Sequence, residues 1–160
     1  MFNRSRTLLL YSLLLSALCV GRLEGATTSA KTLALPAWAE HRLSQKDVTS
    51  KFELTHQLSP TFLLGDFNRD GQQDVAVLAR HKVTRKLGIL VLHNGEQKIH
   101  PLGCGTAIGN GGDDFDWMDF WRLGKSRATK ADALYVGREG SASGLIYWNG
   151  VKYSWEQMGD

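Results

Sequence analysis

The sequence predicts a mostly β domain of two strand meanders, blade-like in layout, with a short helix ahead of them. Apolar or alternating segments rich in branched and aromatic residues follow one another from residue 51 onward. The dipeptide Asn-Gly, which favours tight hairpins, occurs between such segments at Asn94–Gly95 and again at Asn149–Gly150. The order of segments around the first turn recurs around the second.

The predicted elements begin with a helix over Pro36–Lys46, because proline suits a first turn and Trp38, Ala39 and Leu43 can share one face. Branched residues and period-two alternation then predict strands. These are Lys51–Leu58, Thr61–Leu64, Asp74–Arg80, Leu87–His93 and Lys98–His100, followed by Asp132–Arg138, Gly144–Gly150 and Val151–Trp155.

Two related units are expected, over about 51–102 and 117–160. DVAVLAR at Asp74–Arg80 corresponds to DALYVGR at Asp132–Arg138, and a repeat of about 55 residues is typical of propeller-like blades. The alternative is a coincidence between two ordinary hairpins. The glycine-rich segment Gly103–Gly112 is expected to be a loop that crosses between the units.

The N-terminus predicts export. Met1–Arg6 is basic and Thr7–Val20 is apolar, the arrangement of a secretory signal, here assigned to residues 1–21. The apolar run is shorter than the roughly 20 residues that a membrane-spanning helix needs. A core helix is the alternative. Residues 22–34 are expected to be a leader and 35–160 a single domain, periplasmic or secreted, with no transmembrane segment after signal removal.

Charge and cysteine content narrow the classes further. Without Arg4 and Arg6, which leave with the signal, 17 basic residues face 16 acidic ones, so a nucleic-acid partner is not expected. Cys19 leaves as well. The remaining Cys104 then has no intrachain disulfide partner.

The turn after Leu64 has the spacing of a calcium loop. Oxygen-bearing side chains occupy positions 1, 3, 5 and 9, Gly71 permits a sharp bend at position 6, and position 7 offers a backbone carbonyl. The predicted Ca²⁺ ligands are Asp66, Asn68, Asp70, Gln72 and Asp74. The alternative is an Asx-rich turn without a metal.

Gly65–Val77 (GDFNRDGQQDVAV) resembles the FG-GAP repeats of integrin α-subunits and of bacterial VCBS-type proteins. An EF-hand does not fit, because position 12 is Val77 instead of a glutamate. The resemblance implies a calcium loop between two strands of a propeller blade. The second unit has Gly124–Ala131 in place of the loop and lacks the ligands, and two units are too few for a closed propeller.

The remaining acidic, cysteine, histidine and basic residues are expected to have ordinary structural roles. Asp113, Asp114, Asp116 and Asp119 are expected to lie in a solvated loop, although a second ion or a catalytic pair is conceivable. Cys104 with His93 or His100 lacks an orienting group for thiol catalysis. The histidines are expected at the surface or in strands, and the basic turn Arg80–Lys86 at a solvated hairpin tip.

Aromatic residues crowd the C-terminal hairpin and form either core or an exposed ligand platform: Tyr147, Trp148, Tyr153 and Trp155. The function expected is a non-enzymatic, calcium-binding interaction module for a protein or an envelope surface. The alternative is an accessory domain that binds carbohydrate or peptidoglycan through these aromatics.

Overall fold

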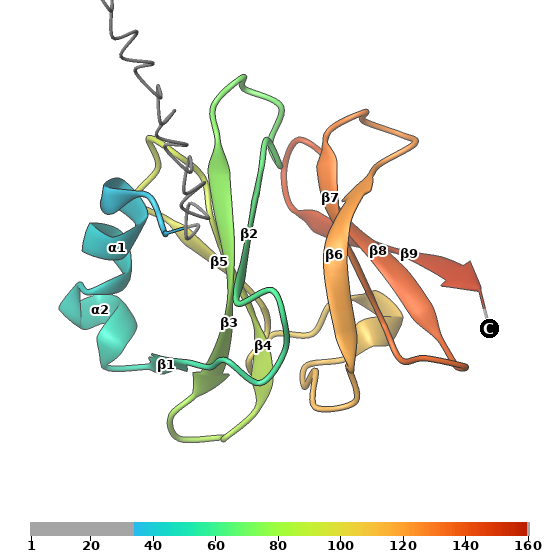
Figure 1. Cartoon of the computed structure of the whole chain (residues 1–160), viewed down its shortest axis with the longest axis horizontal. Helices are drawn as coiled ribbons and strands as arrows, with labels where there is room; N and C mark the ends of the chain where they lie inside the picture. Colours follow the sequence, from blue (N-terminus) through green and yellow to red (C-terminus); the bar gives the residue numbers. More distant parts are fainter. Residues whose placement is uncertain (1–33, 160) are drawn as a thin grey trace, which may run out of the picture. The chain divides into compact units, whose positions relative to one another are not determined.

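A computed structural model describes residues 34–159, which form two short helices followed by two antiparallel sheets (Figure 1). The predicted signal peptide and almost all of the predicted leader lie outside the described residues. The helices are α1 (Ala37–Leu43) and α2 (Lys46–Thr49). No helix among the described residues has the length and apolar character required to cross a membrane.

The first sheet contains β1 (Phe52–Leu54), β2 (Phe62–Gly65), β3 (Asp74–His81), β4 (Leu87–Leu92) and β5 (Ile99–Gly103). β1 and β2 pair with the two ends of β3, and β4 and β5 follow in order. The second sheet has the order β6 (Phe120–Lys125), β7 (Asp132–Gly137), β8 (Ser143–Trp148) and β9 (Tyr153–Gly159). The predicted mostly β fold with two meanders is therefore confirmed.

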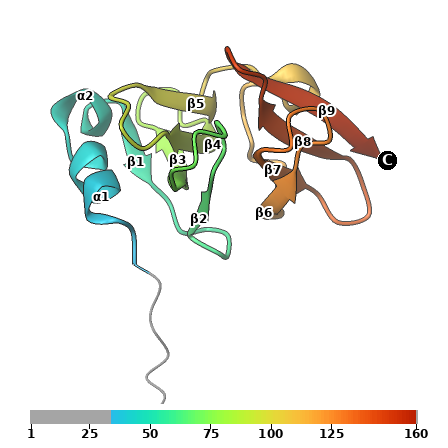
Figure 2. The ribbon, with the colours of Figure 1, turned by 90° about the horizontal axis from the view of Figure 1, so that it is seen from above.

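The described part of the chain has three layers, with the helices on one face of the first sheet and the second sheet on the other (Figure 2). Val75, Val77 and Ala79 pack toward the helices, whereas the alternate residues Ala76 and Leu78 pack toward the second sheet. Because β3 and β4 are covered on both faces, they read as continuous apolar runs instead of alternating patterns.

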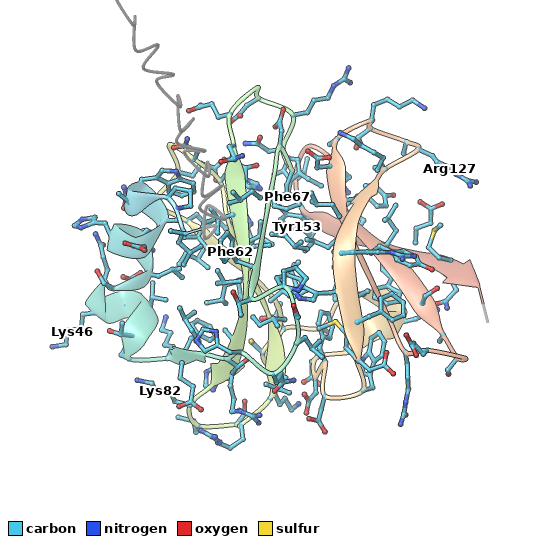
Figure 3. All side chains as sticks on the ribbon, in the orientation of Figure 1. Lys46, Phe62, Phe67, Lys82, Arg127 and Tyr153 are labelled. Carbon is cyan, nitrogen blue, oxygen red and sulfur yellow. The ribbon has the colours of Figure 1, made fainter. Side chains whose placement is uncertain are left out.

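The two apolar layers are visible in the side-chain view (Figure 3). Phe62 belongs to the layer between the helices and the first sheet, and Phe67 and Tyr153 belong to the layer between the sheets. Trp121 and Leu134 supply the second sheet's share of this inter-sheet core, and both are almost completely buried.

Several boundaries differ from the sequence-based prediction. The predicted helix over residues 36–46 is two helices, because Ser44 ends α1 and Gln45 precedes α2 in extended conformation. β1 is much shorter than the predicted strand. β6 continues through Lys125, a segment in which the sequence suggested only a degenerate loop, because its backbone pairs with β7 as far as Asp132.

The glycine-rich crossover has a packing role that explains its composition. It includes a 3₁₀ turn, η1 (Gly109–Gly111), that lies against the indole of Trp155. A Cβ atom at Gly109 would fall 2.3 Å from the Trp155 side chain, and one at Gly144 in β8 would fall 2.1 Å from it. Trp155 therefore fits only because glycine backbone faces it from both the crossover and the neighbouring strand.

Candidate functional site

The β2–β3 and β4–β5 connections lie at the same end of the first sheet, because Val75 at the start of β3 pairs with Leu92 at the end of β4. The β2–β3 connection is the predicted calcium loop, here called the Asp66–Asp74 loop. The β4–β5 connection, residues 93–98, contains the Asn94–Gly95 turn, with a hydrogen bond from the Glu96 N–H to the His93 carbonyl.

The Asp66–Asp74 loop folds around its own oxygen atoms. The Asp66 carboxylate accepts hydrogen bonds from the N–H groups of Asp70 and Gly71, at 3.0 and 3.1 Å. Asn68 donates its side-chain amide to the Asp70 carboxylate at 2.8 Å. Gly71 adopts φ +84°, the left-handed conformation that the sharp bend requires.

Asp74 is fully buried and joins the two connections. Its Oδ2 accepts hydrogen bonds from the N–H groups of Phe67 and Asn68, and its Oδ1 accepts one from Asn94 at 2.8 Å. Burial raises the pKa of the Asp74 carboxyl, against the opposing effects of the Asn94 N–H and of His93. Asp74 is thus a structural acceptor at this end of the sheet.

The same loop is bonded to the second sheet. The Asp66 N–H donates to the Asp132 carboxylate at 2.9 Å, and the Asp132 N–H donates to the Asp66 carbonyl at 3.0 Å. The Arg69 guanidinium points away from the loop interior and donates to the Thr129 carbonyl. Order in the loop is therefore coupled to the junction of the two sheets.

The predicted ligands carry the oxygen atoms that calcium prefers, but only some of these side chains lie close together. Asp66, Asn68 and Asp70 turn toward one another, and a carboxylate oxygen with one hydrogen bond, such as Asp74 Oδ1, keeps a free lone pair. Asp66, Asp70 and Asp74 do not form a group of ligand atoms within 4.8 Å of one another. An ion would have to draw them closer together. The Gln72 side chain is exposed, so only its carbonyl suits the predicted role.

A different set of side chains does have its ligand atoms within 4.8 Å of one another. Among residues 34–159, His93, Glu96 and His100 are the one set of three or more such side chains whose ligand atoms all lie within 4.8 Å of one another. His93 and His100 are buried. His100 lies in β5, in agreement with the expected strand position, and His93 directly follows β4. The signal present in the sequence was His-x-x-Glu-x-x-x-His spanning the Asn-Gly turn.

The four aromatics do not share one exposed face. Tyr153 is buried, and Trp148 and Trp155 pack half-buried against the inter-sheet core. Trp148 pairs with Tyr153 across β8 and β9, and the two rings meet edge to face. Tyr147, which alternates with Trp148, lies on the opposite face. Burial raises the pKa of the Tyr153 hydroxyl, as do the Asp74 and Glu96 charges.

The acidic segment is divided among separate structural bonds. Asp113 forms an ion pair with Lys86, Asp114 accepts from the Leu87 N–H at 2.9 Å, and Asp119 accepts from the Glu139 N–H. Asp113 and Asp114 both hold the start of β4, Asp119 holds the turn after β7, and Asp116 is exposed. No two of them are directed at a common point by these bonds.

Cys104 lies on the helix-covered face of the first sheet, and His93 and His100 lie on the opposite face. Its thiol donates to the Ala79 carbonyl at 3.3 Å, and burial raises the Cys104 pKa to about 12. The arrangement therefore lacks a thiolate–imidazole pair.

The basic turn is largely neutralised within the chain. Arg85 forms a 2.7 Å ion pair with Glu53, Lys86 pairs with Asp113, and Lys82 donates to the Thr49 carbonyl. These contacts agree with a hairpin tip anchored to its neighbours.

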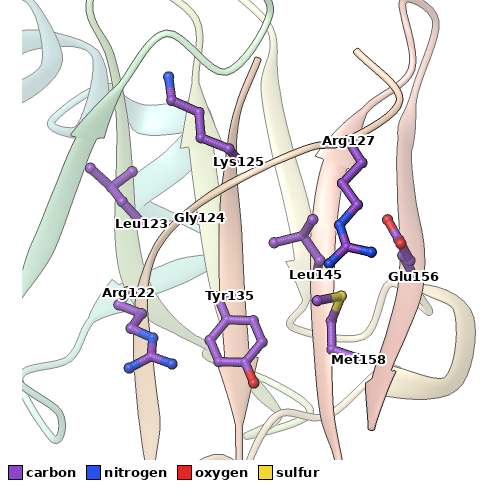
Figure 4. Close-up of a pocket in the computed structure, with 9 residues that line it drawn as sticks. All are labelled: Arg122, Leu123, Gly124, Lys125, Arg127, Tyr135, Leu145, Glu156 and Met158. Atoms are coloured by element: carbon purple, nitrogen blue, oxygen red, sulfur yellow. The ribbon is translucent and has the colours of Figure 1, made fainter. Parts of the chain in front are cut away.

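The outer face of the second sheet forms an open hollow of about 320 Å³ (Figure 4). Arg122 lies over the Tyr135 ring, 4.7 Å from its centroid, and Met158 is exposed on the same face. Leu123 lines the edge of the hollow from the other face of β6, where it lies against Gly65 of β2. The hollow is completed by Gly124, Lys125, Arg127, Leu145 and Glu156.

No protein-family model, no curated protein and no solved structure matches the chain significantly.

Proposed function

We propose that this chain is an exported, non-enzymatic binding module, stabilised by Ca²⁺ in the Asp66–Asp74 loop, that contacts an acidic protein through the outer face of its second sheet. Export rests on the basic and apolar N-terminus, and calcium rests on the spacing of the loop's oxygen donors. The bonds from Asp66 to Asp132 support a structural role for the ion, because ordering the loop would also hold the two sheets together.

The observation that carries the binding proposal is the composition of the outer face. Met158, on this face, is 37% accessible and belongs to neither hydrophobic cluster of residues 34–159. Arginine, aromatic residues and methionine are enriched in the cores of protein interfaces, and this face has all three. A flat aromatic platform, the arrangement suited to a sugar ring, is not what surrounds the hollow.

Charge indicates the chemistry of the partner. Arg122, Lys125 and Arg127 surround the hollow with Glu156 as the one acidic lining residue, and Lys125 is already paired with Asp132. The two arginines are therefore the cations available to a partner, so an acidic protein segment complements this face.

The experiment titrates the full chain with a labelled poly-glutamate peptide, in calcium, by fluorescence anisotropy. Arg122→Glu is expected to weaken binding by roughly tenfold, equivalent to about 1.4 kcal/mol, because an attractive contact becomes repulsive. Lys152→Glu, at an exposed position in the β8–β9 turn, makes the same charge change away from the hollow and is the matched control.

Equal weakening by both variants would show a response to net charge alone and would contradict the proposal. Peptidoglycan fragments form a second arm. Binding of these fragments, with no binding of the peptide, would favour the carbohydrate-binding alternative instead.

A further inference from the structure

His100 presents a buried polar atom that no atom of residues 34–159 satisfies. Its side chain is 8% exposed, and Nε2 makes no hydrogen bond. The nearest carboxylate oxygen, Oε2 of Glu96, is 3.5 Å away. A buried donor or acceptor without a partner costs about 1–3 kcal/mol, so its retention calls for an explanation.

The surroundings of this atom are those of a metal site. Nδ1 of His93 lies 3.3 Å from Oε1 of Glu96, and Nε2 of His100 lies 3.5 Å from Oε2 of the same carboxylate. In a tetrahedral zinc site with bonds of about 2.0–2.1 Å, neighbouring ligand atoms are separated by about 3.3–3.4 Å. Both histidine nitrogens already stand at nearly this spacing from the carboxylate.

We propose that His93, Glu96 and His100 bind a divalent transition metal of the zinc class, with the fourth position open to water. Two imidazoles and one carboxylate are a ligand set that zinc uses, whereas calcium prefers oxygen ligands throughout. The site is thus separate in chemistry from the oxygen-only Asp66–Asp74 loop, and it does not depend on the proposed function.

Local structure brings the three ligands together. The turn at Asn94–Gly95 places Glu96 beside His93, and the pairing of Val91 with His100 brings His100 to the same face of the first sheet. The two imidazole rings stand 4.6 Å apart. Trp148, from the second sheet, meets both rings edge to face at 5.0 and 5.1 Å and so restricts their rotation.

Tyr153 supplies an outer partner for His93. Its hydroxyl lies 2.8 Å from Nε2, the ring nitrogen not directed at Glu96. A hydroxyl donates or accepts, so His93 keeps this partner when Nδ1 binds a metal and Nε2 carries the proton. Ligating histidines almost always have such a partner, which fixes the ring orientation.

The cluster is open to solvent at Glu96 and, separately, beside His100. The Glu96 side chain is 44% exposed, and an open hollow of about 270 Å³ is lined by His100 and Tyr153. Lys98 and Lys152 also line the hollow, and Glu96 supplies the negative charge of the cluster itself. Burial, together with His93 and Lys98, lowers the pKa of His100 and favours the neutral imidazole that a metal requires.

The test is calorimetric titration of the untagged full chain with Zn²⁺, with calcium present to occupy the Asp66–Asp74 loop. One equivalent is expected to bind. Glu96→Gln and His100→Gln should each weaken binding by at least about 100-fold, and Tyr153→Phe by about 10-fold, because it disturbs only the orientation of His93. Co²⁺ should give a ligand-field absorption spectrum in the wild type that is lost in Glu96→Gln.

Two controls make the result specific. His56→Gln removes an exposed histidine and should leave Zn²⁺ affinity unchanged, as should Asp70→Ala in the loop. Because Glu96 is exposed, Glu96→Gln tests the site even if His100→Gln fails to fold. Equal affinity in the wild type and Glu96→Gln, or loss of Zn²⁺ binding in Asp70→Ala alone, would overturn the proposal.

Discussion

Cys104 shows how burial controls the chemistry of a single residue. The thiolate is the reactive form of cysteine, and burial, with Asp114 nearby, raises the Cys104 pKa to about 12. At pH 8 only about one thiol in 10⁴ would therefore be ionised. The thiol is also covered by the helix-facing core and bonded to the Ala79 carbonyl.

Cys104 is accordingly expected to resist iodoacetamide in the native protein at pH 8 and to react fully in urea. Peptide mapping by mass spectrometry separates its signal from that of Cys19. Rapid labelling of Cys104 in the native protein would contradict its assignment as an inert core residue.

At the scale of elements, the β8–β9 hairpin and the crossover form one packing unit around Trp155. The indole lies against Gly144 and against Gly109 and Gly111 of η1, and its Nε1 donates to Gln157 at 3.1 Å. Asn110 donates to the same Gln157 oxygen. The aromatic residue thus attaches an otherwise irregular segment to the second sheet.

Gly144→Ala should destabilise the protein by about 1–3 kcal/mol, because its Cβ would lie 2.1 Å from the Trp155 ring and force the ring to move. Urea unfolding followed by circular dichroism measures the loss. Trp155→Leu makes room for the added methyl group, so the double variant should be more stable than the sum of the two single changes predicts. If the two changes in unfolding free energy simply add, the close approach of residue 144 to the Trp155 ring has no effect on stability.

At the scale of the whole described fold, the Asp66–Asp74 loop is where ligand binding and the junction of the sheets coincide. The loop contacts the second sheet through Asp132 and Thr129. Through Asp74 it also contacts the β4–β5 turn of the first sheet. An ion that binds the folded loop and not the unfolded chain stabilises the whole by mass action.

Calcium at 100 times its Kd would contribute about 2.7 kcal/mol, which corresponds to a rise in Tm on the order of 10 °C for a domain of this size. Scanning calorimetry in calcium and in chelator measures the shift. Asp70→Ala should abolish it, whereas Asp116→Ala, which removes an exposed aspartate outside the loop, should retain it.

Glu96→Gln should retain the calcium shift as well, which separates this effect from the histidine cluster. An unchanged Tm in calcium and chelator would leave the Asp66–Asp74 turn as a hydrogen-bonded Asx turn without a metal.

Local chemistry made much of the fold predictable from the sequence. Apolar runs, Asn-Gly turns and glycine at a bend act over a few residues, so strands β3, β4, β7 and β8 and their hairpins follow directly from the amino-acid pattern. The order of oxygen-bearing residues in the Asp66–Asp74 loop is equally local, and it suffices to predict a turn built around its own side chains.

Tertiary structure alone decided which residues meet across the molecule. β6 forms because its backbone pairs with β7. His93 and His100 become buried because the second sheet places Trp148 and Tyr153 against them. The face that each aromatic residue occupies depends on how the two sheets pack. Such contacts join residues up to 66 positions apart, and they depend on packing energies that no short stretch of sequence contains.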